Sequence, residues 1–275
     1  MGSDQVPAWQ EHYSSMLFWK FEGCLSSDHL ASGVAFMEKA TEIKKGDMVL
    51  DLGCGLGGHS IELARRGYDV TGLDWSEIYL GAAKRQAAET GVSVQFQQGD
   101  MTNLTFDEQF DAVILWGNTF GEFEHEDNVQ TLYGIRRALR KGGRALIDTQ
   151  NYQGLPEKLT QGWSFDSEDP NLLMLTQGTK DAARARFGFD VLAINLATGE
   201  RQRLPYSWRL YLLPELESMI REAGMNLTTV YGDDPKKVDW KAYRRGDPYP
   251  YAPEGFTDAA AKRILLCQAQ GGSDD

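Results

Sequence analysis

A glycine-rich segment between an expected strand and an expected helix is the strongest chemical signal in the sequence. Residues 51–58 read DLGCGLGG. Glycines at such a turn let the backbone approach a ligand where a Cβ atom would clash, and the helix that follows begins with unpaired N–H groups. Taken alone, the segment predicts only a nucleotide site of some kind, because dinucleotide-dependent enzymes use a similar loop.

Two acidic residues at the ends of the next two expected strands narrow this prediction. Asp74 lies 21 residues after Gly53, where a carboxylate can accept hydrogen bonds from both hydroxyls of a ribose. Asp100 ends the following strand, where it can meet an adenine amino group. The two acids together predict a bound adenosine. They disfavour a nicotinamide dehydrogenase, in which Asp100 has no obvious role.

This set of residues resembles the motifs of the class I S-adenosylmethionine-dependent methyltransferases, over roughly residues 45–150, 214–231 and 263–269. The family's first motif is an acid followed by Gly-x-Gly-x-Gly. The resemblance implies S-adenosylmethionine as methyl donor, S-adenosylhomocysteine as product and no metal. The residues that we expect to bind the donor are Asp51, Gly53, Gly55, Gly57, Asp74, Trp75, Asp100, Met101 and Leu115.

A narrower resemblance concerns the ends of two later strands. Residues 117–120 read GNTF and residues 148–152 read DTQNY, which is similar to the Gly-Asn-Ser-Phe and Asp-x-x-Asn-Tyr segments of the glycine and sarcosine N-methyltransferases. In that family these segments lie beside the methyl donor and the amine acceptor, so Asn118 and Tyr152 are expected catalytic residues. Thr119 replaces the family's Ser. The family's carboxylate-binding arginine has no clear counterpart, and Arg209 is one candidate.

Two further residues are candidates for the catalytic site, each with a structural alternative. His125 lies in an acidic segment after the fourth expected strand, where it could act as a general base or remain a solvated loop residue. Tyr13 lies on one face of an expected N-terminal helix together with Trp9. That helix could close over the donor, or its aromatic residues could simply pack in an amphipathic helix.

The pattern of apolar segments predicts the elements that position these residues. Strand-length apolar segments alternate with helical patterns from about residue 48, which is typical of a parallel sheet covered by helices. With the family resemblance, we expect an α/β fold with a Rossmann-like, mostly parallel seven-stranded sheet, helices on both faces and an antiparallel last strand. Residues 46–157 would form the donor-binding core, and residues 1–45 would form an N-terminal helical lid.

The alternation of strand-length apolar segments with helical patterns changes after Tyr152. Residues 158–213 contain strand-like stretches and a hairpin signal near residues 197–199, which predicts an antiparallel β insertion. Alternation along residues 206–211 would place Arg209 and Tyr211 on one face. They could contact the acceptor, or the insertion could be the surface of a homodimer. Residues 214–275 would complete the core, with a long loop at 232–256.

Charge limits the classes of partner. The 275 residues carry a net charge of −12, and residues 107–127 contain seven acids and neither Lys nor Arg. Because nucleic-acid binding depends on clustered basic residues, nucleic acid is an unexpected partner. An acidic rim would instead attract amines or other cations. The sequence shows no signal-peptide pattern and no apolar run of membrane-spanning length. Three cysteines without a pairing pattern favour the cytoplasm.

The sequence therefore favours methyl transfer from S-adenosylmethionine to a small molecule, most reasonably at an amine nitrogen. Methylation of oxygen or carbon in a secondary metabolite is an alternative, because the acceptor pocket lies outside the donor motifs. A protein that modifies macromolecules, or a catalytically silent platform that binds the donor, is a further alternative.

Overall fold

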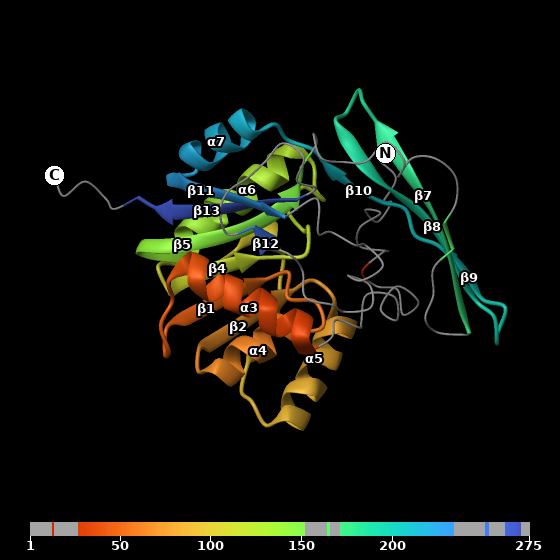
Figure 1. The fold of residues 1–275 in the computed structure, drawn as a ribbon, viewed down its shortest axis with the longest axis horizontal. Coiled ribbons are helices and arrows are strands. Elements are labelled where there is room, and N and C mark those ends of the chain that lie inside the picture. Colours follow the sequence, from red (N-terminus) through yellow and green to blue (C-terminus); the bar gives the residue numbers. More distant parts are fainter. Residues whose placement is uncertain are drawn as a thin grey trace, which may run out of the picture.

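The centre of the molecule is a mixed sheet of eight strands (Figure 1). The computed structural model describes residues 13, 27–151, 164–165, 171–233, 251–252 and 262–270. The strand order is β12-β11-β13-β5-β4-β1-β2-β3. The strands are β1 (Met48–Leu52), β2 (Asp69–Asp74), β3 (Gln95–Gln98), β4 (Phe110–Leu115), β5 (Leu139–Gln150), β11 (Met225–Asp233), β12 (Tyr251–Ala252) and β13 (Lys262–Ala269).

The pairing of these strands confirms the predicted fold class. Strands β1 to β5 pair in parallel, and β13 runs antiparallel to both β5 and β11. Strand β13 is the last strand of the chain, as expected. The seven predicted strands are all present. The two-residue strand β12 adds an eighth at the edge, beside β11, within the region predicted as a long loop; residues 234–250 of that loop lie outside the described residues.

Strand β4 shows why the centre of the sheet is so apolar. Val113, Ile114 and Leu115 are all 0% exposed, because a parallel sheet with helices on both faces buries side chains on both sides. Val113 and Leu115 belong to one core cluster and Ile114 belongs to the cluster on the opposite face.

Helices cover both faces of the sheet (Figure 1). The helices α3 (Ser27–Thr41) and α4 (Gly58–Arg66) contribute to the cluster around Ile114. The helices α6 (His125–Ala138) and α7 (Leu213–Glu222) contribute to the cluster around Val113. Helix α5 (Glu77–Thr90) packs beside α4 over β3. Since α3 is part of the core, the proposal of a lid within residues 1–45 now concerns the residues before Ser27, of which Tyr13 is described.

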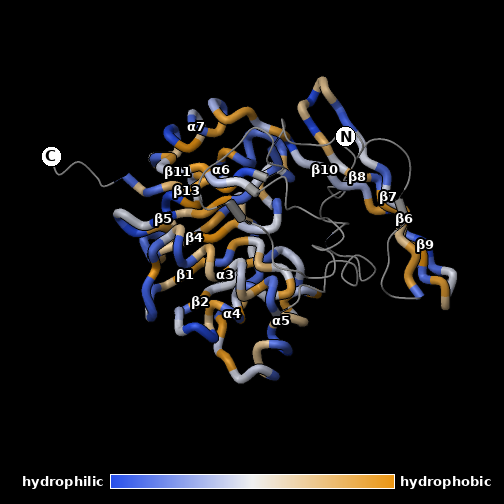
Figure 2. The backbone as a smooth tube through the Cα atoms, viewed as in Figure 1, coloured by the Kyte–Doolittle hydropathy of each residue, from blue (hydrophilic) through white to orange (hydrophobic). Residues whose placement is uncertain are grey.

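A separate antiparallel sheet stands to one side of the main sheet (Figure 1). Its strands are β6 (Ser164–Phe165), β7 (Leu172–Asp181), β8 (Arg186–Asn195), β9 (Arg201–Arg203) and β10 (Tyr206–Arg209). The predicted hairpin joins β8 to β9, which pair antiparallel. Apolar and polar residues interleave along β7 and β8 (Figure 2). One face buries Met174, Val191 and Ala193 against Tyr79 of α5, so this sheet packs toward the carboxyl ends of the main strands.

Candidate active site

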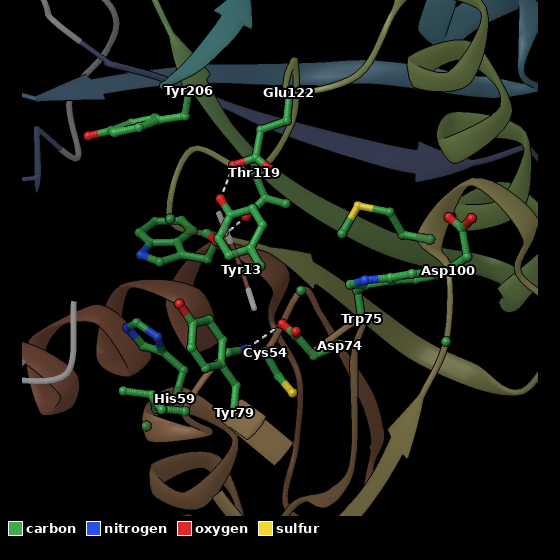
Figure 3. A pocket seen from close by; sticks show the side chains of 18 of the residues that line it. Tyr13, Cys54, His59, Asp74, Trp75, Tyr79, Asp100, Thr119, Glu122 and Tyr206 are labelled. Carbon is green, nitrogen blue, oxygen red and sulfur yellow. Dashed lines mark hydrogen bonds between the residues drawn. The ribbon is translucent and has the colours of Figure 1, made fainter. Parts of the chain in front are cut away.

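A cavity of about 210 Å³ lies at the carboxyl ends of β1, β2 and β4 (Figure 3). This is the edge of an open α/β sheet at which ligands bind, because the strand-to-helix loops there leave a crevice. The structure brings six of the expected donor residues into the lining of this one cavity: Gly53, Gly55, Asp74, Trp75, Asp100 and Met101.

The glycines of the loop between β1 and α4 serve two different purposes. Gly55 and Gly57 have φ angles of +54° and +77°, in the left-handed region that glycine adopts without strain. A Cβ atom on Gly55 would meet nothing within 4 Å, whereas one on Gly57 would lie 2.8 Å from atoms of both Ala83 and Phe96. Gly55 therefore leaves open space for a ligand, and Gly57 permits the close packing of the loop on α5 and β3.

Asp74 is held rigidly at the wall of the cavity (Figure 3). Its Oδ2 accepts a hydrogen bond from the Gly55 N–H at 2.8 Å, and its Oδ1 accepts one from the Ser76 N–H at 2.8 Å. Burial raises the pKa of this carboxyl, while the hydrogen bonds from Ser76 and Gly55 act in the opposite direction. Each carboxylate oxygen can accept a further hydrogen bond, which a ribose hydroxyl would provide.

Asp100 and Trp75 lie next to each other on the same side of the cavity (Figure 3). Oδ1 of Asp100 accepts hydrogen bonds from the Thr102 N–H at 2.8 Å and from the Thr102 hydroxyl at 2.7 Å. Oδ2 accepts none from the described residues. The acid is thus fixed in position with one oxygen available, and the Trp75 ring offers an apolar surface beside it.

Three other residues expected to bind the donor do not line the cavity: Asp51, Gly57 and Leu115. Asp51 is buried and accepts a hydrogen bond from the Ser60 hydroxyl at 2.5 Å, which ties the end of β1 to the first turns of α4. Desolvation raises the pKa of Asp51 to about 6. Leu115 is buried in the core. Asp51 and Gly57 help to hold the loop in shape, Leu115 packs in the core, and none of the three lines the cavity.

The Cys54 thiol also belongs to the cavity lining and is buried. Burial raises the pKa of this thiol well above 9.0, and the nearby carboxylates of Asp51 and Asp74 raise it further. Cys267 is a second buried free thiol, in β13, and its pKa is raised to about 12 by burial.

At the other end of the cavity, Tyr13 and Glu122 form a hydrogen-bonded pair (Figure 3). The Tyr13 hydroxyl donates to Oε1 of Glu122. The backbone carbonyl of Tyr13 accepts a hydrogen bond from the Ser76 hydroxyl at 2.7 Å, and its ring meets the Tyr79 ring edge-on with centroids 6.2 Å apart. Tyr13 is therefore fixed against both sides of the cavity.

The antiparallel sheet contributes Tyr206 and Trp208 of β10 to the cavity lining. The expected alternation along β10 is present, but the face that lines the cavity is the opposite of the one expected. Arg209 instead lies over the ring of Tyr211, 5.3 Å from its centroid, and donates to the Arg184 carbonyl. Tyr211 is 1% exposed in the core. Trp208 is 7% exposed, and its indole Nε1 has no hydrogen-bond partner among the described residues.

His125 begins helix α6 and does not line the cavity. Its Nδ1 lies 3.3 Å from the Tyr211 hydroxyl. That hydroxyl also accepts a hydrogen bond from Nδ2 of Asn128 at 3.1 Å, and the same Nδ2 donates to the Phe123 carbonyl at 2.9 Å. The contacts of His125 and Tyr211 therefore belong to a network beneath the loop that follows β4.

Asn118 adopts a left-handed backbone conformation, with φ of +64°, between the cavity-lining residues Gly117 and Thr119. Its N–H donates to Oδ1 of Asp148 at 2.7 Å. Asn118 itself does not line the cavity, and its side-chain oxygen is buried without a hydrogen-bond partner among the described residues. Tyr152, the residue paired with Asn118 in the sequence prediction, lies outside the described residues.

Arg186 of β8 joins the antiparallel sheet to the loop between β4 and α6 (residues 116–124), which we call the acidic loop. Its guanidinium donates to the carbonyls of Glu122 and Phe123, at 2.7 and 3.1 Å, and to the hydroxyl and carbonyl of Ser207, both at 2.9 Å. It also lies 3.4 Å from a carboxylate oxygen of Glu124. An arginine side chain that is only 14% exposed and has this many partners fixes the backbone that carries Glu122.

The sequence prediction missed most residues of the acceptor end. The signal for Glu122 was present, because the acidic segment after β4 was identified as a rim that attracts cations. The alternation of side chains along residues 206–211 places Tyr206 and Trp208 on one face, but periodicity alone does not tell which face lines a cavity. The cavity-lining residues that the prediction did not assign to the site include Tyr79, Trp116, Thr119, Glu122, Tyr206 and Trp208.

Two kinds of feature are absent from the described residues. No group of three or more His, Cys, Asp and Glu side chains there could hold a metal ion. No helix in that part of the chain is both long and apolar enough to cross a membrane.

Comparison with known proteins agrees with this geometry. A family model described as a methyltransferase domain matches residues 49–143. The chain is 33% identical over 236 residues to the cypemycin N-terminal methyltransferase of a Streptomyces species, covering 82% of this chain and 84% of that one. It is 29% identical over 208 residues to a glycine/sarcosine N-methyltransferase of Aphanothece halophytica, covering 73% and 72%.

The fold has close counterparts among solved structures. An S-adenosylmethionine-dependent methyltransferase from Clostridium acetobutylicum superposes with a TM-score of 0.73 at 15% identity, covering 93% of this chain and 97% of that one. Together with the relative that is similar over most of its length, the glycine loop and the two strand-end acids lead to one conclusion: this chain belongs to the class I S-adenosylmethionine-dependent methyltransferases.

Proposed function

We propose that the protein transfers a methyl group from S-adenosylmethionine to an amine nitrogen of a small-molecule acceptor. The observation that carries this proposal is the Tyr13–Glu122 pair, which places a carboxylate in the same cavity as Asp74 and Asp100. Two relatives named for N-methylation support it, one at an N-terminus and one on glycine and sarcosine. A carboxylate beside aromatic rings suits an amine, which is cationic until it loses a proton.

The residues of the donor half fit S-adenosylmethionine. Asp74 would accept hydrogen bonds from the ribose hydroxyls, Asp100 would accept one from the adenine amino group, and Trp75 and Met101 would pack against the base. The open space beside Gly55 admits the part of the donor that approaches the loop. When bound, the donor supplies a methyl group on a positively charged sulfur, which leaves with the electron pair of the broken S–C bond as S-adenosylhomocysteine.

The residues of the acceptor half would prepare the amine. Its nitrogen must present a lone pair, so the enzyme must bind it neutral and aligned. The Glu122 carboxylate would accept a hydrogen bond from the amine N–H, and it can take the proton that the methylated nitrogen releases. Asn118, between the lining residues Gly117 and Thr119, would have to turn its side chain toward the cavity to accept a second N–H bond. Holding both reactants in line in one cavity would supply much of the catalysis.

The donor assignment is tested by calorimetric titration with S-adenosylmethionine. Asp74→Ala should weaken donor binding by about 1 to 3 kcal/mol, the scale for leaving polar groups unpaired. The matched control is Asp69→Ala, at the exposed opposite end of the same strand, which should bind the donor like the wild type. Equal affinities for Asp74→Ala and the wild type would contradict the assignment.

The acceptor assignment is tested with a methylation screen of amines, phenols and carboxylic acids. Glu122→Gln should lower kcat/KM for the best amine by about 10- to 100-fold, the scale of one charged hydrogen bond, without changing donor affinity. Glu126→Gln is the control, because Glu126 is exposed at the start of α6 and does not line the cavity. Exclusive methylation of oxygen or carbon would overturn the nitrogen proposal.

A further inference from the structure

A second cavity, of about 610 Å³, adjoins the first. The two share four lining residues: Tyr13, Glu122, Phe123 and Tyr206. The remaining walls of the second cavity come from the start of α6 and from the antiparallel sheet, including Asp127, Thr179 and Phe189. The Tyr13–Glu122 pair therefore stands between a small chamber that holds the donor residues and a larger one that holds none of them.

Among the described residues, the larger cavity has acidic groups but no arginine left to bind an anion. Arg186 and Arg203 are the only arginines among the described lining residues. Arg203 pairs with Asp190, its Nε lying 2.7 Å from a carboxylate oxygen. Arg186 uses its guanidinium N–H groups on Ser207, on two carbonyls of the loop and on Glu124. A guanidinium has five N–H donors, and the five contacts account for all of them.

The uncompensated charge on the described residues that line the larger cavity is negative. The Asp127 carboxylate makes no hydrogen bond or ion pair with the described residues, and Asp127 lines the cavity together with Glu122. A carboxylate on a bound molecule would lie beside these two acids with no cationic partner among the described residues, and such contact between like charges opposes binding. An amide, a hydroxyl or a second cationic group would be accepted.

We infer that the larger cavity binds the body of the acceptor, and that this acceptor is an amine on an extended body without a carboxylate beside the reacting nitrogen. The inference rests on the proposed transfer to nitrogen. It separates this chain from enzymes that methylate a free amino acid, whose carboxylate needs an unpaired cation. The amine would pass Tyr13 and Glu122 into the smaller cavity while its body stays between α6 and the antiparallel sheet.

Three probes of increasing size test the inference: alanine, alaninamide and the amide of alanyl-alanyl-alanine. We expect alaninamide to exceed alanine in kcat/KM by about tenfold or more, because it lacks the carboxylate. The tripeptide amide should exceed alaninamide by a similar factor, because only it reaches the larger cavity. Alanine equal to alaninamide, or no gain from the longer body, would overturn the inference.

A variant that fills the larger cavity locates the effect. Thr179 is exposed on β7 and lines the larger cavity but not the smaller one, and an exposed strand position tolerates a large aromatic residue. Thr179→Trp should remove the advantage of the tripeptide amide and leave alaninamide unchanged. Thr198→Trp, in the exposed β8–β9 turn of the same sheet, should change neither. Retention of the full advantage in Thr179→Trp would contradict the assigned cavity.

The outcomes distinguish this inference from the proposed function. If amines are methylated but alanine is preferred, transfer to nitrogen stands and the inference fails. If only phenols or carbon acceptors are methylated, the proposed function fails and the inference fails with it. Calorimetric titration of the protein saturated with S-adenosylhomocysteine gives an answer independent of turnover: the tripeptide amide should bind and alanine should not, and absence of binding by the amide overturns the inference.

Discussion

The two ends of the cavity are built in different ways. At the donor end, the polar side chains come from the loops after β1, β2 and β3, and backbone N–H groups of the same loops hold them, as Gly55 and Ser76 hold Asp74. At the acceptor end, Tyr13 bonds to a residue 109 positions away, and Arg186 reaches more than 60 positions back to the acidic loop.

This difference separates the donor end, which depends on local contacts, from the acceptor end, which depends on contacts between distant segments. Bonds between neighbours in the chain form whenever the loop folds, so the donor end depends mainly on local backbone geometry. The acceptor end depends on three segments that meet only in the tertiary structure. The antiparallel sheet and the acidic loop can therefore change without disturbing the donor end, and mutations should affect the two ends separately.

The largest effect should come from Gly57→Ala, because Gly57 lies where the glycine loop packs on α5 and β3 at the donor end. Its Cβ would lie 2.8 Å from both Ala83 and Phe96, and the left-handed φ of +77° disfavours any side chain. Overpacking and backbone strain together should lower the free energy of unfolding by about 4 kcal/mol, measured by urea denaturation.

Gly55→Ala is the matched control in the same loop. Its φ of +54° carries a similar backbone cost, but its Cβ would enter open cavity space. It should lose about 1 kcal/mol of stability and should weaken donor binding more than its stability loss suggests. Equal stability losses for the two variants would contradict the different purposes that we assign to the two glycines.

The next effect should be confined to the acceptor end. A Cβ on Gly188 of β8 would lie 2.5 Å from the Cβ of Ser207 in the paired strand β10. Gly188→Ala must therefore displace the strand that carries Tyr206 and Trp208. We expect kcat/KM for the best acceptor to fall by about 100-fold, or about 2.7 kcal/mol, while the affinity for S-adenosylmethionine stays unchanged. A matching loss of donor affinity would show that the two ends are not separable.

The smallest effect concerns the pH dependence of stability at the donor end. The pKa of Asp51 is raised from 3.8 to about 6 by burial, so the folded state holds its proton more tightly than the unfolded chain. The stabilisation that comes from the protonated Asp51 carboxyl is complete below pH 3.8 and is lost as the pH rises through 6. Between pH 4 and pH 6 the free energy of unfolding should fall by about 2 kcal/mol from this group.

Asp51→Asn isolates that contribution, because asparagine keeps an acceptor for the Ser60 hydroxyl and does not titrate. Urea denaturation at pH 4, 5 and 6 should show the wild type losing stability relative to the variant. Asp69→Asn, at the exposed end of the neighbouring strand, should follow the wild type. A constant difference between the wild type and Asp51→Asn would exclude Asp51 as the source of the pH dependence.

The sequence signals for the donor end are local. The glycine loop, the strand that ends at Asp74 and the helix that begins after Ser76 are all encoded within about 40 residues. The predicted fold class and family are confirmed. The functions of the individual residues stay predictions, although the structure does bring six of the expected donor residues to one cavity.

The acceptor end was harder to predict for physical reasons. Periodicity correctly separated Trp208 from Arg209 but could not identify which face meets the cavity, since that depends on how the second sheet is placed. Tyr211 and His125 are polar residues near the site in sequence, yet their contacts lie in a network under the loop. The pairing of Tyr13 with Glu122 joins segments that no local pattern connects.

The Cys54 thiol has a consequence for the chemical durability of a methyltransferase. A thiolate is a strong nucleophile, and one in a cavity that holds a methyl sulfonium would be exposed to irreversible self-alkylation. Burial and the negative charge of Asp51 and Asp74 raise the pKa of Cys54 well above 9.0, so the sulfur keeps its proton at neutral pH. The same carboxylates and buried surroundings that prepare the cavity for a ligand thus favour the protonated, weakly nucleophilic form of its own thiol.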